Sequence, residues 1–210
     1  MDYSYIAVEG PIGVGKTTLA RRIAESTDAR ILYDPESENP FLEDFYNKPG
    51  SYALHTQLDF LVRRSALLDE ELQTVGSEPL VTDFLIAKDR LFAELTLNED
   101  ELWLYERIHE KLVSALPAPS LVIYLQAPPE TLMARIETRG IGFEQRMASG
   151  YLQRLSDAYA TFFHEYSETP LLIVNAEEIN FADNNRDYEN LLEQIGEVGA
   201  GRHYLNPLPA

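Results

Sequence analysis

The stretch IAVEGPIGVGKTTLARRIAE, which runs from Ile6 to Glu25, carries the pattern that decides the fold. The apolar residues at its start predict a short buried strand over Tyr5–Val8. Glycines then mark a turn, and from Thr17 to Ser26 the apolar residues recur at helical spacing. A buried strand followed directly by a glycine-rich turn and a helix is typical of proteins in which helices cover a parallel sheet.

The turn matches the complete pattern G-x-x-x-x-G-K-[ST]. In such a loop, backbone N–H groups and the helix N-terminus point at phosphate oxygens. The lysine reaches the terminal phosphates, and the threonine hydroxyl can bind magnesium. A turn that binds nothing is the alternative, but the complete motif between a strand and a helix argues against it. We therefore expect the loop to bind a nucleoside triphosphate, ATP, through Gly10, Pro11, Ile12, Gly13, Val14, Gly15, Lys16, Thr17 and Thr18.

The rest of the chain alternates predicted strands and helices. Continuous apolar runs predict strands at 31–33, 120–127 and 170–176, and residues 79–86 read as a strand that ends at Asp83 and runs into a functional loop. Helical periodicity predicts helices at 51–73, 99–116, 129–140, 149–166 and 187–198. Continuous rather than alternating apolar runs indicate strands that are buried on both faces, as in an α/β fold whose parallel sheet is flanked by helices on both faces. Prolines and a glycine break residues 39–50 into an expected short helix and loop. No linker or repeat divides the chain, so we expect one domain over 1–210, with a loose tail at 200–210.

Composition excludes several classes of function. The chain has no cysteine, which rules out disulfides and cysteine-based zinc sites and suits a cytoplasmic location. A formal net charge of -18 would repel nucleic acid. No apolar run approaches the length of a membrane span, and the N-terminus does not read as a signal peptide. The four histidines have no metal-ligand spacing.

Three further stretches narrow the function. They are YDPESENPFLEDFYNKPGSYALHTQLDFLVRR, VTDFLIAKDRLFAELTL and RIETRGIGFEQ. Together with the phosphate loop, and in this order, they resemble the deoxyribonucleoside kinase family, close to its bacterial deoxyguanosine/deoxyadenosine kinase branch, over roughly Ile6 to Ile195. The resemblance implies a P-loop kinase fold with a helical lid at about 135–150. It also implies transfer of phosphate from ATP, with Mg²⁺, to the 5'-hydroxyl of a deoxyribonucleoside, with purines preferred.

The resemblance also implies which residues bind the nucleoside. Asp34 matches the carboxylate that contacts the 5'-hydroxyl, with Glu36 as a rival because it lies so close in sequence. Tyr46 matches a tyrosine that binds the sugar 3'-hydroxyl. Gln57 matches a glutamine that hydrogen-bonds the base. Two further positions match residues that support the base pocket, namely Arg64 and Asp89.

The resemblance assigns the transfer step to a strand end and to the lid. Asp83 matches the general base and is expected to share magnesium with Thr17. Phe84 occupies the nucleoside-facing position that many relatives fill with an arginine. Arg135 and Arg139 match arginines that hold the phosphates during transfer. The other lid positions are Glu144, which matches a glutamate that reaches the 3'-hydroxyl, Ile141, which replaces a common arginine, and Arg146, a candidate substitute for that arginine.

Without the resemblance, most of these residues have simpler interpretations. Arg135 and Arg139 lie four apart on one helix face and read as solvated charges. Gln57 and Arg64 could flank an apolar helix stripe, and Asp83 could cap a turn. Tyr46 by itself would read as a packing residue.

Three other functions stay open at this stage. A nucleoside monophosphate kinase of the thymidylate type would need more basic residues for its acceptor phosphate, whereas the NPFLEDFY and TQLDFL segments offer carboxylate, tyrosine and amide groups. A GTPase switch would need an N-K-x-D motif, which the late strands lack. A catalytically inactive structural relative is disfavoured by the intact Lys16, Thr17 and Asp83. Apolar faces on the long helices suit a homodimer.

Overall fold

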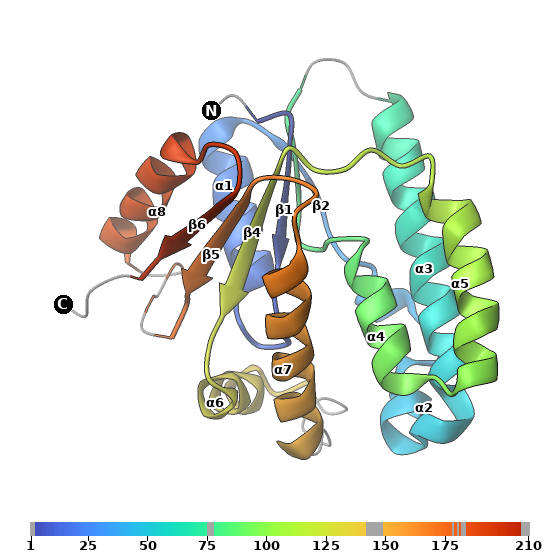
Figure 1. Ribbon diagram of the computed structural model, residues 1–210. Coiled ribbons are helices and arrows are strands. Elements are labelled where there is room, and N and C mark those ends of the chain that lie inside the picture. Colours follow the sequence, from blue (N-terminus) through green and yellow to red (C-terminus); the bar gives the residue numbers. More distant parts are fainter. Residues whose placement is uncertain are drawn as a thin grey trace.

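A parallel six-stranded sheet forms the centre of the molecule, with helices on both of its sides (Figure 1). The computed structural model describes residues 3–74, 78–141, 149–177, 179, 181 and 184–206. The strand order is β2-β3-β1-β4-β5-β6, and every pairing is parallel. The strands are β1 Tyr5–Glu9, β2 Arg30–Leu32, β3 Leu80–Thr82, β4 Leu121–Gln126, β5 Leu171–Asn175 and β6 Arg202–Leu205. The predicted parallel α/β architecture is confirmed.

The helices fall into groups around this sheet. Their bounds are α1 Lys16–Thr27, α2 Leu42–Asn47, α3 Pro49–Thr74, α4 Lys88–Thr96, α5 Glu99–Val113, α6 Pro129–Arg139, α7 Ser149–Glu165 and α8 Asn185–Glu197, with a short 3₁₀ helix, η1, at Glu36–Glu38. Helix α1 packs against β1, β2 and β3, while α3, α4 and α5 pack on one another (Figure 1). Among the described residues, no helix is long and apolar enough to cross a bilayer.

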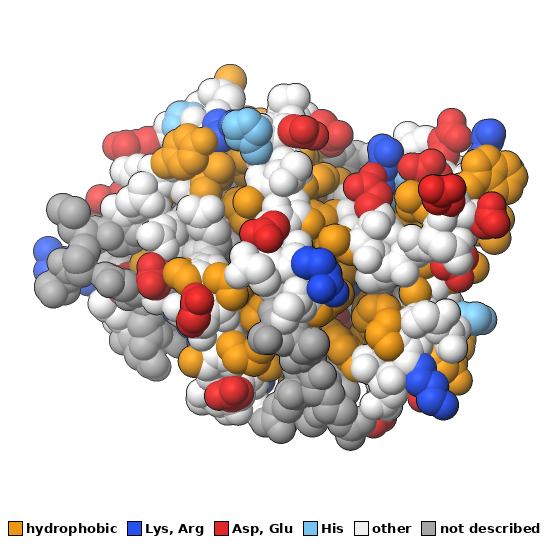
Figure 2. Space-filling view, turned by 60° about the horizontal axis from the view of Figure 1, so that its bottom comes forward, with side chains coloured by type: hydrophobic (Ala, Val, Ile, Leu, Met, Phe, Trp, Pro, Cys, Tyr) orange, Lys and Arg blue, Asp and Glu red, His pale blue; other side chains and the backbone are white. Residues whose placement is uncertain are grey.

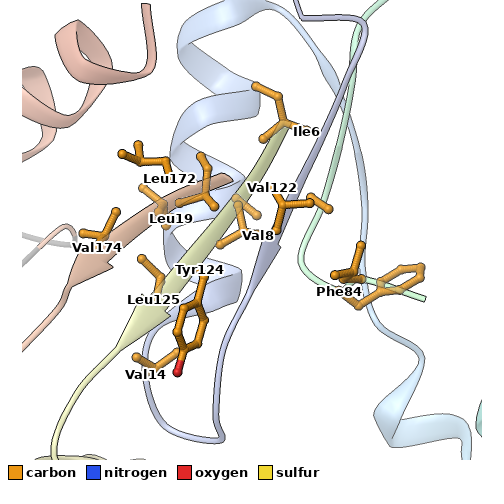
Figure 3. Close-up of a cluster of buried hydrophobic side chains, with 14 of the residues drawn as sticks. Ile6, Val8, Val14, Leu19, Phe84, Val122, Tyr124, Leu125, Leu172 and Val174 are labelled. Atoms are coloured by element: carbon orange, nitrogen blue, oxygen red, sulfur yellow. The ribbon is translucent and has the colours of Figure 1, made fainter. Parts of the chain in front are cut away.

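The core forms where the apolar strands meet the helices. Figure 3 shows side chains of β1, β4 and β5 gathered around Leu19 of α1. Val8, Leu19 and Val122 are fully buried. On α7, Phe163 stacks on Tyr124 of β4 with ring centroids 4.1 Å apart. Burying apolar surface on both faces of the sheet stabilises the fold and fixes which strand ends lie together.

Three sequence expectations need correction. The predicted loose tail contains a strand, β6, which pairs with β5. The Arg202 guanidinium anchors it by donating to the backbone oxygen of His164 at 2.6 Å. We did not predict this strand because the sequence of β6 is polar and resembles that of a loop. Pro49 does not interrupt a helix but begins α3, where the missing proline N–H would have no partner in any case. Residues 88–96, which none of the predicted helices included, form α4.

Candidate active site

The loop between β1 and α1 is shaped by glycine. Gly10 and Gly13 have φ values of 154° and 84°. A Cβ atom on Gly10 would lie 2.3 Å from the backbone oxygen of Leu125, and one on Gly13 would lie 2.9 Å from that of Leu132. Neither position accepts a side chain without moving backbone, so the loop conformation requires glycine at both.

A cavity of about 310 Å³ opens over this loop, and we call it the donor cavity. The loop residues Gly13, Gly15, Lys16, Thr17 and Thr18 line it, together with Ile12, Tyr33, Asp34, Glu36, Asp83, Arg135 and Arg139. The structure thus brings the predicted phosphate loop, the predicted strand-end carboxylate and both predicted lid arginines to one space. It lies at the carboxyl ends of the strands, which is the usual ligand site of an open α/β sheet.

The Lys16 side chain folds back onto the start of the phosphate loop. Its Nζ donates to the backbone oxygens of Gly10 at 2.8 Å and Pro11 at 3.3 Å. Burial lowers the pKa of Lys16, and the negative charge of Glu9 opposes that change. The Arg135 guanidinium, which also lines the donor cavity, donates to the backbone oxygen of Ala176 at 2.8 Å. Both cations are therefore positioned by backbone carbonyls.

Asp83 and Thr17 form a close pair in the wall of the donor cavity. The Thr17 hydroxyl donates to Asp83 Oδ2 at 2.6 Å, and the backbone N–H of Asp34 donates to Asp83 Oδ1 at 2.6 Å. Asp83 lies just after β3, which pairs directly with β1. One hydroxyl and one carboxylate fit Mg²⁺, an ion that keeps several waters and takes most other ligands from substrate phosphates.

A second cavity, which we call the acceptor cavity, adjoins the first. Tyr46, Gln57 and Arg64 all line it, although they come from α2 and from two turns of α3. Aromatic and apolar residues complete its wall, among them Leu42, Phe45, Phe60, Phe92, Tyr151 and Tyr159. Its volume of about 40 Å³ has room for only a few water molecules, so any larger ligand must displace side chains of the wall.

Asp89 and Phe84 do not line the acceptor cavity. Asp89 is buried and forms an ion pair with Arg64. Burial raises the pKa of Asp89 to about 6, and Arg64 opposes this. Phe84 is fully buried, with its ring 6.0 Å from Arg64 Cζ. The apolar ring of Phe84 thus packs in the core beside Arg64, and a contact between Phe84 and a nucleoside stays a prediction.

Residues 6–198 match the profile of the family described as "Deoxynucleoside kinase". The chain belongs to the deoxynucleoside kinase family. A deoxyguanosine kinase of Bacillus subtilis (strain 168) is 31% identical over 200 residues, covering 92% of this chain and 97% of the relative. A deoxyadenosine/deoxycytidine kinase of the same organism is 27% identical over 203 residues and covers 93% of each chain.

Solved structures agree with the fold. A deoxyadenosine kinase from M. mycoides with bound dATP has a TM-score of 0.80 to this chain at 23% identity, with 92% of this chain and 99% of that chain covered. The P-loop kinase fold, the family and the kinase activity predicted from the sequence are confirmed.

In this kinase, Asp34 is held by two cations. Arg64 donates from Nε to Asp34 Oδ1 and from Nη2 to Asp34 Oδ2, each at 2.8 Å, and Lys88 Nζ donates to Asp34 Oδ2 at 2.9 Å. Burial would raise the pKa of Asp34, but the charges of Arg64 and Lys88 outweigh burial and hold this pKa well below its ordinary value. Lys88 thus supplies a second cation beside Asp34.

Sequence reasoning missed Lys88 and its other partner, Glu9. Glu9 Oε1 accepts hydrogen bonds from the backbone N–H of Gly10 at 2.8 Å and from the Tyr159 hydroxyl at 2.9 Å. Glu9 Oε2 accepts from the backbone N–H of Leu85 at 2.7 Å and lies 3.3 Å from Lys88 Nζ. A single acid in an apolar strand directly before the phosphate loop is the signal that could have found Glu9.

The lid is only partly described. Glu144 and Arg146, both named by the resemblance, lie outside the described residues. Helix α6 ends at Arg139, and Gly140 follows it with a φ of 72°.

The face that includes the carboxyl ends of the strands carries mixed charge. In Figure 2, basic side chains are scattered among acidic and apolar ones. A surface for a nucleic-acid backbone would gather its basic side chains in a stripe or patch. The described side chains of this face do not form one.

Proposed function

We propose that this kinase transfers the γ-phosphoryl group of ATP to the 5'-hydroxyl of a deoxyribonucleoside, with deoxyguanosine or deoxyadenosine preferred, in nucleotide salvage. The observation that carries the proposal is that the donor and acceptor cavities share a wall, to which Ile12, Lys16 and Glu36 belong. Phosphoryl transfer needs donor and acceptor aligned at such a junction, with positive charge beside the transferring group.

On the donor side, we expect positive charge and magnesium to provide most of the stabilisation of the transferring phosphates. Lys16, Arg135 and Arg139 supply positive charge to the phosphates of ATP. Thr17 and Asp83 would hold Mg²⁺, because both line the donor cavity and their oxygens lie 2.6 Å apart. The ion, when bound, neutralises negative charge on the phosphates.

On the acceptor side, the side chains suit a neutral nucleoside. The Gln57 amide both donates and accepts hydrogen bonds, which matches the edge of a purine base. Tyr46 lines the same cavity and is proposed to bind the sugar, and Arg64 supports the base pocket while Asp34 and Asp89 hold it in place. Glu144 is proposed to reach the 3'-hydroxyl from the lid. The names of the related deoxyguanosine and deoxyadenosine kinases support the purine preference.

The thymidylate-type alternative fits less well. Its acceptor carries a phosphate and needs a cation beyond those of the phosphate loop. Apart from Lys16, the cations that line the acceptor cavity in the described chain are Arg64 and Lys88, and both are paired with carboxylates. An inactive relative would have no need for the Thr17–Asp83 pair over an intact loop.

A panel of the four natural deoxyribonucleosides and thymidine monophosphate, each with ATP and magnesium, tests the proposal. We expect monophosphate product chiefly from deoxyguanosine or deoxyadenosine, detected by separating the nucleotides. Product from thymidine alone, or only from the monophosphate, would overturn it.

Two properties of the assembled enzyme belong to the same proposal. We expect a homodimer in the cytoplasm, where ATP is available. Support for the dimer comes from apolar side chains left exposed on α3 and α5, where Val62 is 51%, Trp103 61% and Leu104 42% exposed. The mass of the full chain in solution, measured by light scattering, tests this part.

A further inference from the structure

Three carboxylates lie near the junction of the two cavities: Asp34, Glu36 and Asp83. Asp34 and Asp83 line the donor cavity and not the acceptor cavity. Glu36 is the carboxylate that lines both, within the part of the chain that the structure describes. A base for a hydroxyl that attacks a phosphorus atom must reach the point where acceptor and donor meet.

The other two carboxylates are already engaged. Both oxygens of Asp34 accept hydrogen bonds from Arg64, and one of them also accepts from Lys88. Both oxygens of Asp83 accept hydrogen bonds as well, one from the Thr17 hydroxyl and one from the Asp34 backbone. To take a proton, either aspartate would have to give up a contact that organises the site.

Glu36 has no such engagement. Its side chain makes no hydrogen bond or ion pair of its own with the described residues around it. The chain turns sharply at this point, because Glu36 opens the 3₁₀ turn η1 directly after Pro35, and the backbone N–H of Glu38 donates to the Pro35 oxygen at 3.0 Å. This turn brings the Glu36 side chain to the shared wall, beside Lys16.

We infer that Glu36, and not Asp83 or Asp34, is the general base that accepts the proton of the acceptor's 5'-hydroxyl. In this step the O–H bond breaks and its proton goes to a Glu36 carboxylate oxygen. The 5'-oxygen uses its electron pair to form a bond to the γ-phosphorus of ATP. The bond from that phosphorus to the β,γ-bridging oxygen breaks, and its electron pair leaves with ADP. The inference rests on the proposed function and deepens it.

The electrostatics around Glu36 favour this role. Burial raises the pKa of Glu36, and the nearby negative charge of Asp34 raises it further. The cations that face it, Lys16, Lys88 and Arg64, oppose the rise. A carboxylate with a raised pKa is a stronger proton acceptor than Asp34, whose pKa is held low by its ion pairs.

The test compares Glu36→Gln with Glu38→Gln in the full chain. Glu38 lies on the same turn but is exposed and pairs with Arg63 at 3.2 Å, so its variant controls for changes on η1. Each variant is assayed with ATP, magnesium and the best nucleoside of the panel. We expect Glu36→Gln to lower kcat by on the order of 10²-fold or more, the usual effect of losing a general base. We expect Glu38→Gln to stay within about threefold of the original enzyme, as usual for an exposed charge.

Two further readouts separate a base from a structural residue. The acidic limb of the kcat/KM profile against pH should disappear in Glu36→Gln, and Glu36→Asp should recover part of kcat because it keeps the carboxylate. The unfolding temperature of each variant confirms that it is folded.

Near-normal kcat in Glu36→Gln, an unchanged pH profile, or a rise in KM alone would overturn the inference. If the original enzyme phosphorylates the nucleoside but Glu36→Gln gives one of these contrary outcomes, the inference about Glu36 fails and the proposed function stands. If the original enzyme makes no monophosphate, the proposed function fails first.

Discussion

The donor and acceptor cavities are built in different ways. The donor cavity is shaped by backbone. Its loop conformation requires glycine at positions 10 and 13, where a Cβ atom would collide with backbone oxygens, and carbonyl oxygens hold Lys16 and Arg135. The acceptor cavity is shaped by buried side chains, with Arg64 held between Asp34 and Asp89. A backbone-built site is rigid and shows itself in a short motif. A site built from side-chain ion pairs depends on residues far apart in sequence and adapts more easily to its ligand.

The largest effect is expected on the donor side, from Lys16→Ala. Removing a cation that meets the phosphates in the transition state should lower kcat by at least about 10²–10³-fold. The fold should survive, because the hydrogen bonds that Lys16 Nζ makes within the described residues go to backbone oxygens of its own loop. Steady-state kinetics and thermal unfolding measure the two outcomes. An unfolded variant, or one with near-normal turnover, would mean that the phosphate loop does not act as described.

A smaller and more divided effect is expected from Asp83→Asn and Asp34→Asn. Asp83→Asn removes a charge from the proposed magnesium pair, so kcat should fall by roughly 10²-fold and the magnesium dependence should shift, with nucleoside KM nearly unchanged. Asp34→Asn leaves Arg64 and Lys88 without their shared anion. The nucleoside KM should therefore rise, and the free energy of unfolding should fall by about 3 kcal/mol.

Asp59→Asn is the matched control for this pair of variants. Asp59 pairs with Arg63 at 2.7 Å on the same long helix as Arg64 and lines neither cavity. Its loss should change stability by no more than about 1 kcal/mol. If Asp34→Asn changed only kcat, and Asp83→Asn only nucleoside KM, the two cavities would have been assigned the wrong way round.

The smallest effect concerns pH and the acceptor side. The pKa of Asp89 rises from an ordinary value of 3.8 to about 6 in the fold. The folded state therefore binds this proton more tightly than the unfolded chain does. The resulting stability is fully present below about pH 4 and is lost as pH rises through about 6.

Asp89→Asn should remove this pH dependence. The free energy of unfolding of the original protein, minus that of the variant, should fall by on the order of 2–3 kcal/mol between pH 4 and pH 7. Denaturant unfolding at a series of pH values measures it. A difference that stays flat with pH would show that Asp89 does not hold its proton more tightly in the fold.

Much of the donor side could be predicted because its signals are local. The motif from Gly10 to Thr17 predicted the phosphate loop, and the apolar run before Asp83 predicted that this carboxylate follows a strand. That strand is β3, which pairs with β1. Gln57 and Arg64 lie seven residues apart on one helix, so both reach the same cavity.

The acceptor side resisted prediction for a physical reason. Lys88 meets Asp34 across 54 residues, and nothing in the local sequence says that a lysine in AKDR is buried. Phe84 follows Asp83 directly, yet the chain turns its side chain into the core. β6 was missed because an edge strand of polar residues has no apolar run to mark it. Each of these positions depends on tertiary contacts rather than on periodicity.

The strand order has a consequence for how the chain is made. Among the strands that the structure describes, β1 is synthesised before the others, yet its neighbours in the sheet are β3 and β4. Its second neighbour is complete only when Gln126 has been synthesised. Until then, the apolar residues of β1 cannot have their final surroundings, and the phosphate loop that follows β1 lacks the Leu125 carbonyl that packs against Gly10. Sequence separations of this size slow folding, so the nascent N-terminal half is the segment that most needs protection from aggregation during translation.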